Sequence, residues 1–183
     1  MINNFWFWGF LTMFSIFMCT FIITSKKLGS NRLYGTVFVG LLAGSRAILV
    51  LPFIQQPRFS IPSTAALVIG ISIFLVGIFL CIASAPFINP VTKPSREEKL
   101  KTDGLYGMIR HPLMLGEILW PIGWSIIFQS IPGLLFSFIW MFCMYMFSIV
   151  EEERLVEEYG EDYLDYQRRV PKFIPRLRKE INH

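Results

Sequence analysis

Residues 98–117 read EKLKTDGLYGMIRHPLMLGE and join two long apolar regions of the chain. Asp103-Gly104 predicts a turn. Arg110 carries a planar fork of donors that suits a carboxylate or a phosphate. Pro112 is well placed as the first residue of a helix, where its missing N–H is not needed, so His111 is expected at the electropositive N-cap. The stretch therefore predicts that ionisable groups gather where an apolar helix begins.

The distribution of charge places the first half of the chain in lipid. Hydrophobic residues make up 54% of the 183 residues, a length that suits one domain. All 13 acidic residues lie at or after Glu97, so the first 96 residues contain no carboxylate side chain. A soluble surface would mix both signs of charge. We therefore expect an all-α membrane protein with a single integral-membrane domain over residues 1–183.

Five membrane-spanning helices are expected, each long enough to cross a bilayer. They cover residues 3–25, 33–53, 63–86, 113–130 and 132–150. The break between the last two falls at Ser130-Ile131-Pro132-Gly133, and a bend is expected near Pro121. The N-terminus lacks a basic region, so the first span is interpreted as a retained anchor.

The basic residues predict the orientation of these spans. Lys and Arg number three in the first connection, five in the third and seven after Val150, against one and none in the other two connections. Positive residues favour the cytoplasmic side. The N-terminus is therefore expected outside and the C-terminal tail in the cytoplasm. This pattern explains the net charge of +4 without nucleic acid binding.

The tail after Val150 predicts one or two amphipathic helices. Large apolar or aromatic side chains recur every three or four residues there, at Leu155, Tyr159, Tyr163, Tyr166 and Val170. Gly160 is expected to interrupt the helix, and Pro171 to end it. Core packing or contact with the membrane surface explains these residues; alternatively, they close a lid over a cofactor.

Two groups of residues resemble the signatures of a known family. The first is Gly104-Leu105-Tyr106, Arg110-His111-Pro112 and Gly116; the second is Glu151-Glu152…Leu155, Tyr159-Gly160…Tyr163…Tyr166 and Val170-Pro171. In this order and separation they resemble the isoprenylcysteine carboxyl methyltransferases and related phospholipid methyltransferases of membranes. The resemblance covers roughly the C-terminal half.

The resemblance implies S-adenosylmethionine as methyl donor, bound by segments 98–117 and 151–171. The donor-binding positions that it implies are Glu98, Lys99, Leu100, Lys101, Tyr106, His111, Pro112, Leu113, Met114 and Glu151. It assigns Arg110 and Glu151 to the reaction centre, with Arg110 orienting the acceptor or stabilising charge. Relatives often carry Tyr at the position of Met114. No Gly-rich dinucleotide loop occurs in the chain, in keeping with a donor held without a Rossmann domain.

Simpler interpretations remain open for the same residues. Arg110 alone is typical of a cation anchoring a helix end at the membrane surface. Arg46 and Glu117 are charges within spans and hence functional candidates, but they could simply pair with each other. A lipid-binding or carrier protein without catalytic activity is the alternative of another class. The three cysteines are interpreted as buried hydrophobes, and their spacing predicts no metal site.

The expected acceptor is lipophilic and enters from the bilayer, while the donor arrives from the cytosol. Carboxyl methylation of an isoprenylcysteine and N-methylation of a phospholipid both remain possible. The isoprenylcysteine enzymes carry an Arg one turn before the glutamate pair, where this chain has Phe147. Arg46, Arg110 and Arg154 are the cations that could substitute. From Phe147 we expect weak activity on free prenylcysteine carboxylates and better activity on an acceptor that is neutral or whose charge lies elsewhere.

Overall fold

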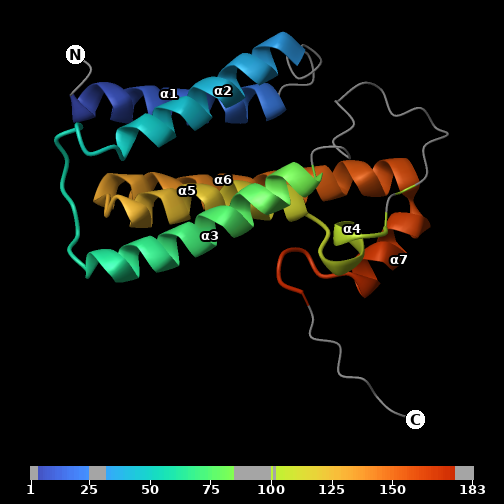
Figure 1. The fold of residues 1–183 in the computed structure, drawn as a ribbon. Helices are drawn as coiled ribbons and strands as arrows, with labels where there is room; N and C mark the ends of the chain where they lie inside the picture. Colours follow the sequence, from blue (N-terminus) through green and yellow to red (C-terminus); the bar gives the residue numbers. More distant parts are fainter. Residues whose placement is uncertain (1–3, 25–31, 85–99, 101, 176–183) are drawn as a thin grey trace.

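The computed structural model describes residues 4–24, 32–84, 100 and 102–175, with side chains left undescribed for residues 19–39. Seven helices form this part of the chain (Figure 1). They are α1 (Phe5–Thr24), α2 (Arg32–Leu49), α3 (Ser63–Ser84), α4 (Leu105–Met108), α5 (Pro112–Ile127), α6 (Ile131–Tyr159) and α7 (Glu161–Arg169). The expected all-α class is confirmed.

Three predicted helix boundaries are confirmed. Helix α5 begins with Pro112, and His111 is its N-cap residue. Ser130 caps α6, because its side chain accepts a hydrogen bond from the N–H of Gly133 at 3.0 Å. Gly160 separates α6 from α7 with φ of 57°, a left-handed value that glycine adopts without strain.

Two predicted boundaries need correction. Helix α2 stops at Leu49, short of the predicted residue 53, because the residue before Pro52 is disfavoured in a helix. Helix α6 continues past Val150 to Tyr159 without a break. The first part of the tail is therefore not a separate helix but the continuation of the fifth predicted span. Helix α5 continues through Pro121, and the bend expected there stays a prediction.

The helices form two layers that run along a common direction (Figure 1). Helices α1 and α2 are an antiparallel pair on one side, and α3, α5 and α6 lie together on the other. The short helices α4 and α7 lie at one end, beside the C-terminal part of α6 and far from the start of α1. Polar groups from α4, α5, α6 and α7 therefore meet at one end of the bundle.

Glycines bring α3 and α5 into backbone contact. A Cβ on Gly77 would lie 2.4 Å from the backbone N of Trp120, and one on Gly123 would lie 2.4 Å from the backbone N of Phe74. Small residues allow this close approach in membrane helices.

Two helices, α3 and α6, are long and apolar enough to cross a membrane. Shorter apolar stretches cover Phe5–Met18, Gly40–Leu49 and Pro112–Ile127. Large apolar side chains such as Phe79 and Phe142 are exposed on the outer faces of α3 and α6. Extensive exposed apolar surface of this kind is typical of contact with lipid.

The two intramembrane charges pair with each other. Arg46 of α2 lies 3.3 Å from a carboxylate oxygen of Glu117 of α5, and its side chain is only 4% exposed. Its guanidinium also lies 4.8 and 4.9 Å from the ring centres of Trp120 and Trp140, within the range of cation–π attraction. The pair links the two helix layers, which supports the structural interpretation of both charges.

Candidate active site

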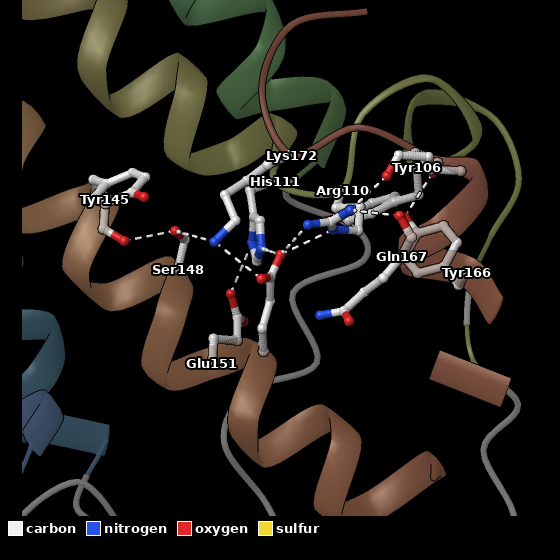
Figure 2. Close-up of polar contacts among 11 residues, drawn as sticks. Tyr106, Arg110, His111, Tyr145, Ser148, Glu151, Tyr166, Gln167 and Lys172 are labelled. Atoms are coloured by element: carbon white, nitrogen blue, oxygen red, sulfur yellow. Dashed lines mark hydrogen bonds and ion pairs between the residues drawn. The ribbon is translucent and has the colours of Figure 1, made fainter. Parts of the chain in front are cut away.

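Figure 2 shows the polar cluster formed where the first turn of α5 meets α6 and the tail. Arg110 uses its whole guanidinium for contacts inside the protein. Its Nε and Nη2 lie 2.9 and 2.8 Å from Oε1 of Glu152, and its Nη1 donates to the carbonyls of Gln167 and Val170 at 3.0 and 2.6 Å. Arg110 therefore connects the tail to α6 through hydrogen bonds and an ion pair.

The backbone strengthens this connection. The N–H of Arg110 donates to the carbonyl of Pro171 at 2.9 Å, and the N–H of His111 donates to the carbonyl of Lys172 at 3.2 Å. The phenol of Tyr166 donates to the carbonyl of Tyr106 at 2.6 Å. The two signature segments are thus joined along residues 106–111 and 166–172.

Glu152 is the centre of the cluster. Besides Arg110, it contacts Nε2 of His111 at 3.0 Å and Nζ of Lys172 at 2.9 Å, and its side chain is only 12% exposed. It lies beyond the apolar part of α6, which ends at Val150. Burial raises the pKa of the Glu152 carboxyl, but hydrogen bonds from Lys172, Arg110 and His111 outweigh it and hold the pKa below its usual range. Glu152 is therefore an anion that orders three neighbouring side chains.

Glu151 is placed differently from its neighbour. One of its carboxylate oxygens lies 3.1 Å from Nδ1 of His111, and its side chain is 50% exposed. His111 is itself buried, and its other ring nitrogen, Nε2, lies 3.0 Å from Glu152. Because Glu152 fixes the imidazole from the inner side, His111 holds the half-exposed carboxylate of Glu151 as a preorganised polar edge on the outer side.

Aromatic side chains of the tail form a buried cluster of their own. Tyr163, Tyr166 and Val170 form a buried cluster, against which Leu100 and Leu155 pack together with Val156 and Tyr159. Burial raises the pKa of Tyr166 to about 12, although Arg110 opposes the shift. The phenol therefore stays protonated and can donate its hydrogen bond at neutral pH. The amphipathic pattern predicted for the tail is confirmed, with its apolar face used for core packing.

The remaining predicted residues lie in several environments. Pro112 is fully buried, and Met114 packs against the bundle core that contains Phe147. Leu113 is half-buried, and Arg154 is exposed on α6. Phe147 is buried with its ring 6.2 Å from that of Trp140. Glu98, Lys99 and Lys101 lie outside the described residues.

Two residues of the cluster are not singled out by the sequence. Glu152 belongs to the glutamate pair, but nothing in the pair indicates which member is buried. Lys172 directly follows Val170-Pro171 of the second signature, and this neighbourhood is its only signal. In the part of the chain that the structure describes, no group of three His, Cys, Asp or Glu side chains is placed to hold a metal ion.

Comparisons with known proteins agree with the signatures. The profile of the phospholipid methyltransferase family matches residues 65–162, more than half of the chain. Protein-S-isoprenylcysteine O-methyltransferase of Schizosaccharomyces pombe is 28% identical over 195 aligned residues, covering 91% of this chain and 82% of that protein. No solved structure matches the chain.

Two further relatives match shorter segments. Methanethiol S-methyltransferase 2 of Bradyrhizobium diazoefficiens is 38% identical over 44% of this chain, and protein-S-isoprenylcysteine O-methyltransferase of Mus musculus is 34% identical over 46% of it. The chain spans 30% of the length of each of these two relatives.

The helical fold and these matches define a membrane methyltransferase. The chain belongs to the phospholipid methyltransferase family.

Proposed function

We propose that this protein transfers a methyl group from S-adenosylmethionine to a lipophilic acceptor at the cytoplasmic end of its helix bundle. The observation that carries the proposal is the convergence of two separate segments on His111. Its two ring nitrogens lie 3.1 and 3.0 Å from the carboxylates of Glu151 and Glu152. One glutamate is buried and fixes the ring, and the other is half-exposed and able to meet a ligand.

The residues on this edge suit the chemistry of the donor. S-adenosylmethionine carries an amino acid group and, when bound, supplies a methyl group on a cationic sulfonium. The exposed carboxylate of Glu151 is a matching partner for the donor's ammonium group. We assign the neighbouring contacts to Tyr106, His111 and the first turn of α5 at Pro112, Leu113 and Met114. Glu98, Lys99, Leu100 and Lys101 are proposed to complete the donor site.

Transfer from a sulfonium depends on alignment of the donor with the nucleophile more than on acid–base chemistry. Arg110 serves this alignment indirectly. All its described contacts are with Glu152 and the tail carbonyls, so we propose that it positions the site and does not contact the acceptor. Arg46, whose side chain is buried against Glu117, is likewise assigned to the fold.

The acceptor is proposed to enter from the bilayer between the helices. Relatives are named for isoprenylcysteine and for methanethiol, so a carboxyl group or a thiol on a lipophilic molecule is the leading acceptor. The family profile is described as phospholipid methyltransferase, and this description favours a phospholipid amine as the alternative.

The test is a methylation assay with radiolabelled S-adenosylmethionine and purified protein. We expect transfer to at least one of three lipids: a prenylcysteine, a long-chain thiol and phosphatidylethanolamine. The labelled product identifies the methylated group. Saturable donor binding without transfer to any of them would contradict a role as an enzyme for these acceptor classes and would favour a lipid-binding protein.

A second expectation concerns topology. We propose one domain over residues 1–183 with five spans, the N-terminus outside and the tail in the cytoplasm. Support comes from the bias of Lys and Arg towards alternate connections and from the position of α4 and α7 at the end opposite the start of α1 (Figure 1). A reporter fused after His183 is expected to face the cytoplasm. An external reporter would contradict this orientation and the cytoplasmic site.

A further inference from the structure

Lys172 is a cation that the proposed donor site does not use. Its Nζ lies 2.9 Å from Oε2 of Glu152 and 3.3 Å from the hydroxyl of Ser148, and 5.4 Å from the centre of the Tyr145 ring. Ser148 donates its own proton to the carbonyl of Tyr145 at 2.6 Å, so its hydroxyl accepts from Lys172. Figure 2 shows Lys172 reaching over α6 towards these residues.

These contacts leave part of the ammonium group available. An ammonium group has three N–H donors, and Glu152 and Ser148 take two of them. The third has no hydrogen-bond acceptor among the described residues, although the Tyr145 ring lies nearby, and the side chain is 21% exposed. Arg110 and Lys172 both contact the single carboxylate of Glu152, while the second carboxylate of the cluster, Glu151, contacts His111. The charge of Lys172 is therefore shared with Arg110 at Glu152 and stays partly exposed.

Lys172, in the tail after α7, packs against a particular face of α6. Large exposed side chains recur on α6 every three or four residues and so share one face; they are Leu135, Phe138, Phe142 and Tyr145. Lys172 lies over the last of them, next to the point where the apolar part of α6 ends at Val150. An amphiphile whose hydrocarbon chain lies along this face would bring its headgroup to Lys172.

We propose that Lys172 binds the headgroup of the lipophilic acceptor and selects a headgroup with a single negative charge, such as a carboxylate. A monoanion suits a single ammonium group that lies close to the carboxylate of Glu152, whereas a phosphate monoester carries nearly two negative charges beside that carboxylate. The proposal rests on the proposed function, because it gives Lys172 a role towards the acceptor of that reaction. It reverses the expectation of weak activity on carboxylates that was drawn from Phe147. Lys172 of the tail contacts Ser148, the residue after Phe147 on α6, and so supplies a cation at this level of the helix.

The test measures binding of matched amphiphiles to the protein in nanodiscs of neutral lipid. The probes are radiolabelled N-hexadecanoylglycine, a monoanion, its neutral amide, and hexadecyl phosphate, with empty nanodiscs as background. The wild-type protein is expected to bind the carboxylate about tenfold more tightly than the amide, the strength of a hydrogen bond to a charged group. Hexadecyl phosphate is expected to bind more weakly than the carboxylate.

Variants at position 172 decide whether the preference comes from Lys172. Lys172→Met is expected to bind acid and amide equally, and Lys172→Arg to keep the preference. If Lys172→Met does not fold, Lys172→Gln, which retains a donor for Glu152 and Ser148 without the charge, replaces it. Absence of a preference in wild type, its survival in the uncharged variant, or tighter binding of the phosphate would overturn the proposal.

Binding of S-adenosylmethionine is measured on the same samples. If Lys172 only supports Glu152, its replacement lowers donor binding and affects both amphiphiles equally, and that result also overturns the proposal. A wild-type protein that binds no donor but still prefers the carboxylate through Lys172 would contradict the proposed function and leave the headgroup site standing.

Discussion

Replacement of Glu152 by alanine is expected to detach the C-terminal tail from the first signature segment and to lower the free energy of unfolding by about 3–5 kcal/mol. Losing one partner of a buried ion pair leaves the other charge without compensation, and such losses are of this size. Here the change leaves Arg110, His111 and Lys172 without their shared carboxylate. Arg110 would no longer join α6 to the tail.

Thermal unfolding in detergent and limited trypsin digestion measure this effect. The variant is expected to unfold at a lower temperature and to be cut faster after Arg168, Arg169 or Lys172. Glu153→Ala is the matched control, because Glu153 is the next residue on α6 and is exposed. Equal stability and equal digestion of the two variants would show that Glu152 does not organise the site.

Replacement of Glu151 by glutamine is expected to weaken donor binding while leaving the stability of the protein nearly unchanged. Affinity for S-adenosylmethionine should fall by about tenfold, because a hydrogen bond to a charged group contributes about 1.5–3 kcal/mol and solvent screening at the half-exposed Glu151 keeps the loss at the lower end. Stability should change little, since the Glu151 side chain is 50% exposed. Equilibrium binding of labelled donor and thermal unfolding, measured together, separate the two effects.

Glu157→Gln is the control for this variant, as Glu157 is another exposed glutamate on α6. It should bind the donor as the wild type does. Unchanged donor affinity in Glu151→Gln would refute the assignment of Glu151 to the donor. His111→Ala is less informative, because His111 is buried between both glutamates and its loss is expected to reduce stability as well as binding.

Local signals in the sequence predicted the elements that form the site. Pro112, Ser130 and Gly160 mark helix ends through backbone chemistry that depends on only a few neighbouring residues. All three positions are confirmed. The convergence of the two signature segments was also expected, since an antiparallel helix pair returns the chain to the end from which it left.

The partners of Arg110 could not be predicted in the same way. Two of its contacts are with the backbone carbonyls of Gln167 and Val170, and every residue carries a carbonyl. The sequence therefore gives no sign of which ones a distant guanidinium will meet. Lys172 escaped prediction for a related reason, because only the turn of the tail after α7 brings it to Ser148, 24 residues away.

The pair of charges within the membrane shows a further limit. Arg46 and Glu117 were equally good candidates for function and for mutual pairing, because either role explains costly charges in lipid. Pairing depends on whether α2 and α5 are neighbours, which hydropathy does not determine. The contact of 3.3 Å between the two side chains confirms the pairing, and a role of Arg46 towards the acceptor stays a prediction.

The most direct test of the central claim is equilibrium binding of S-adenosylmethionine to the purified wild-type protein, with one variant from each signature segment. We expect saturable binding at one site per chain, competed by S-adenosylhomocysteine. Binding should weaken in both Tyr106→Ala and Glu151→Gln, because residues from both segments are proposed to hold the donor. Absence of saturable binding, or binding that is unchanged in either variant, would contradict a single donor site built from both segments.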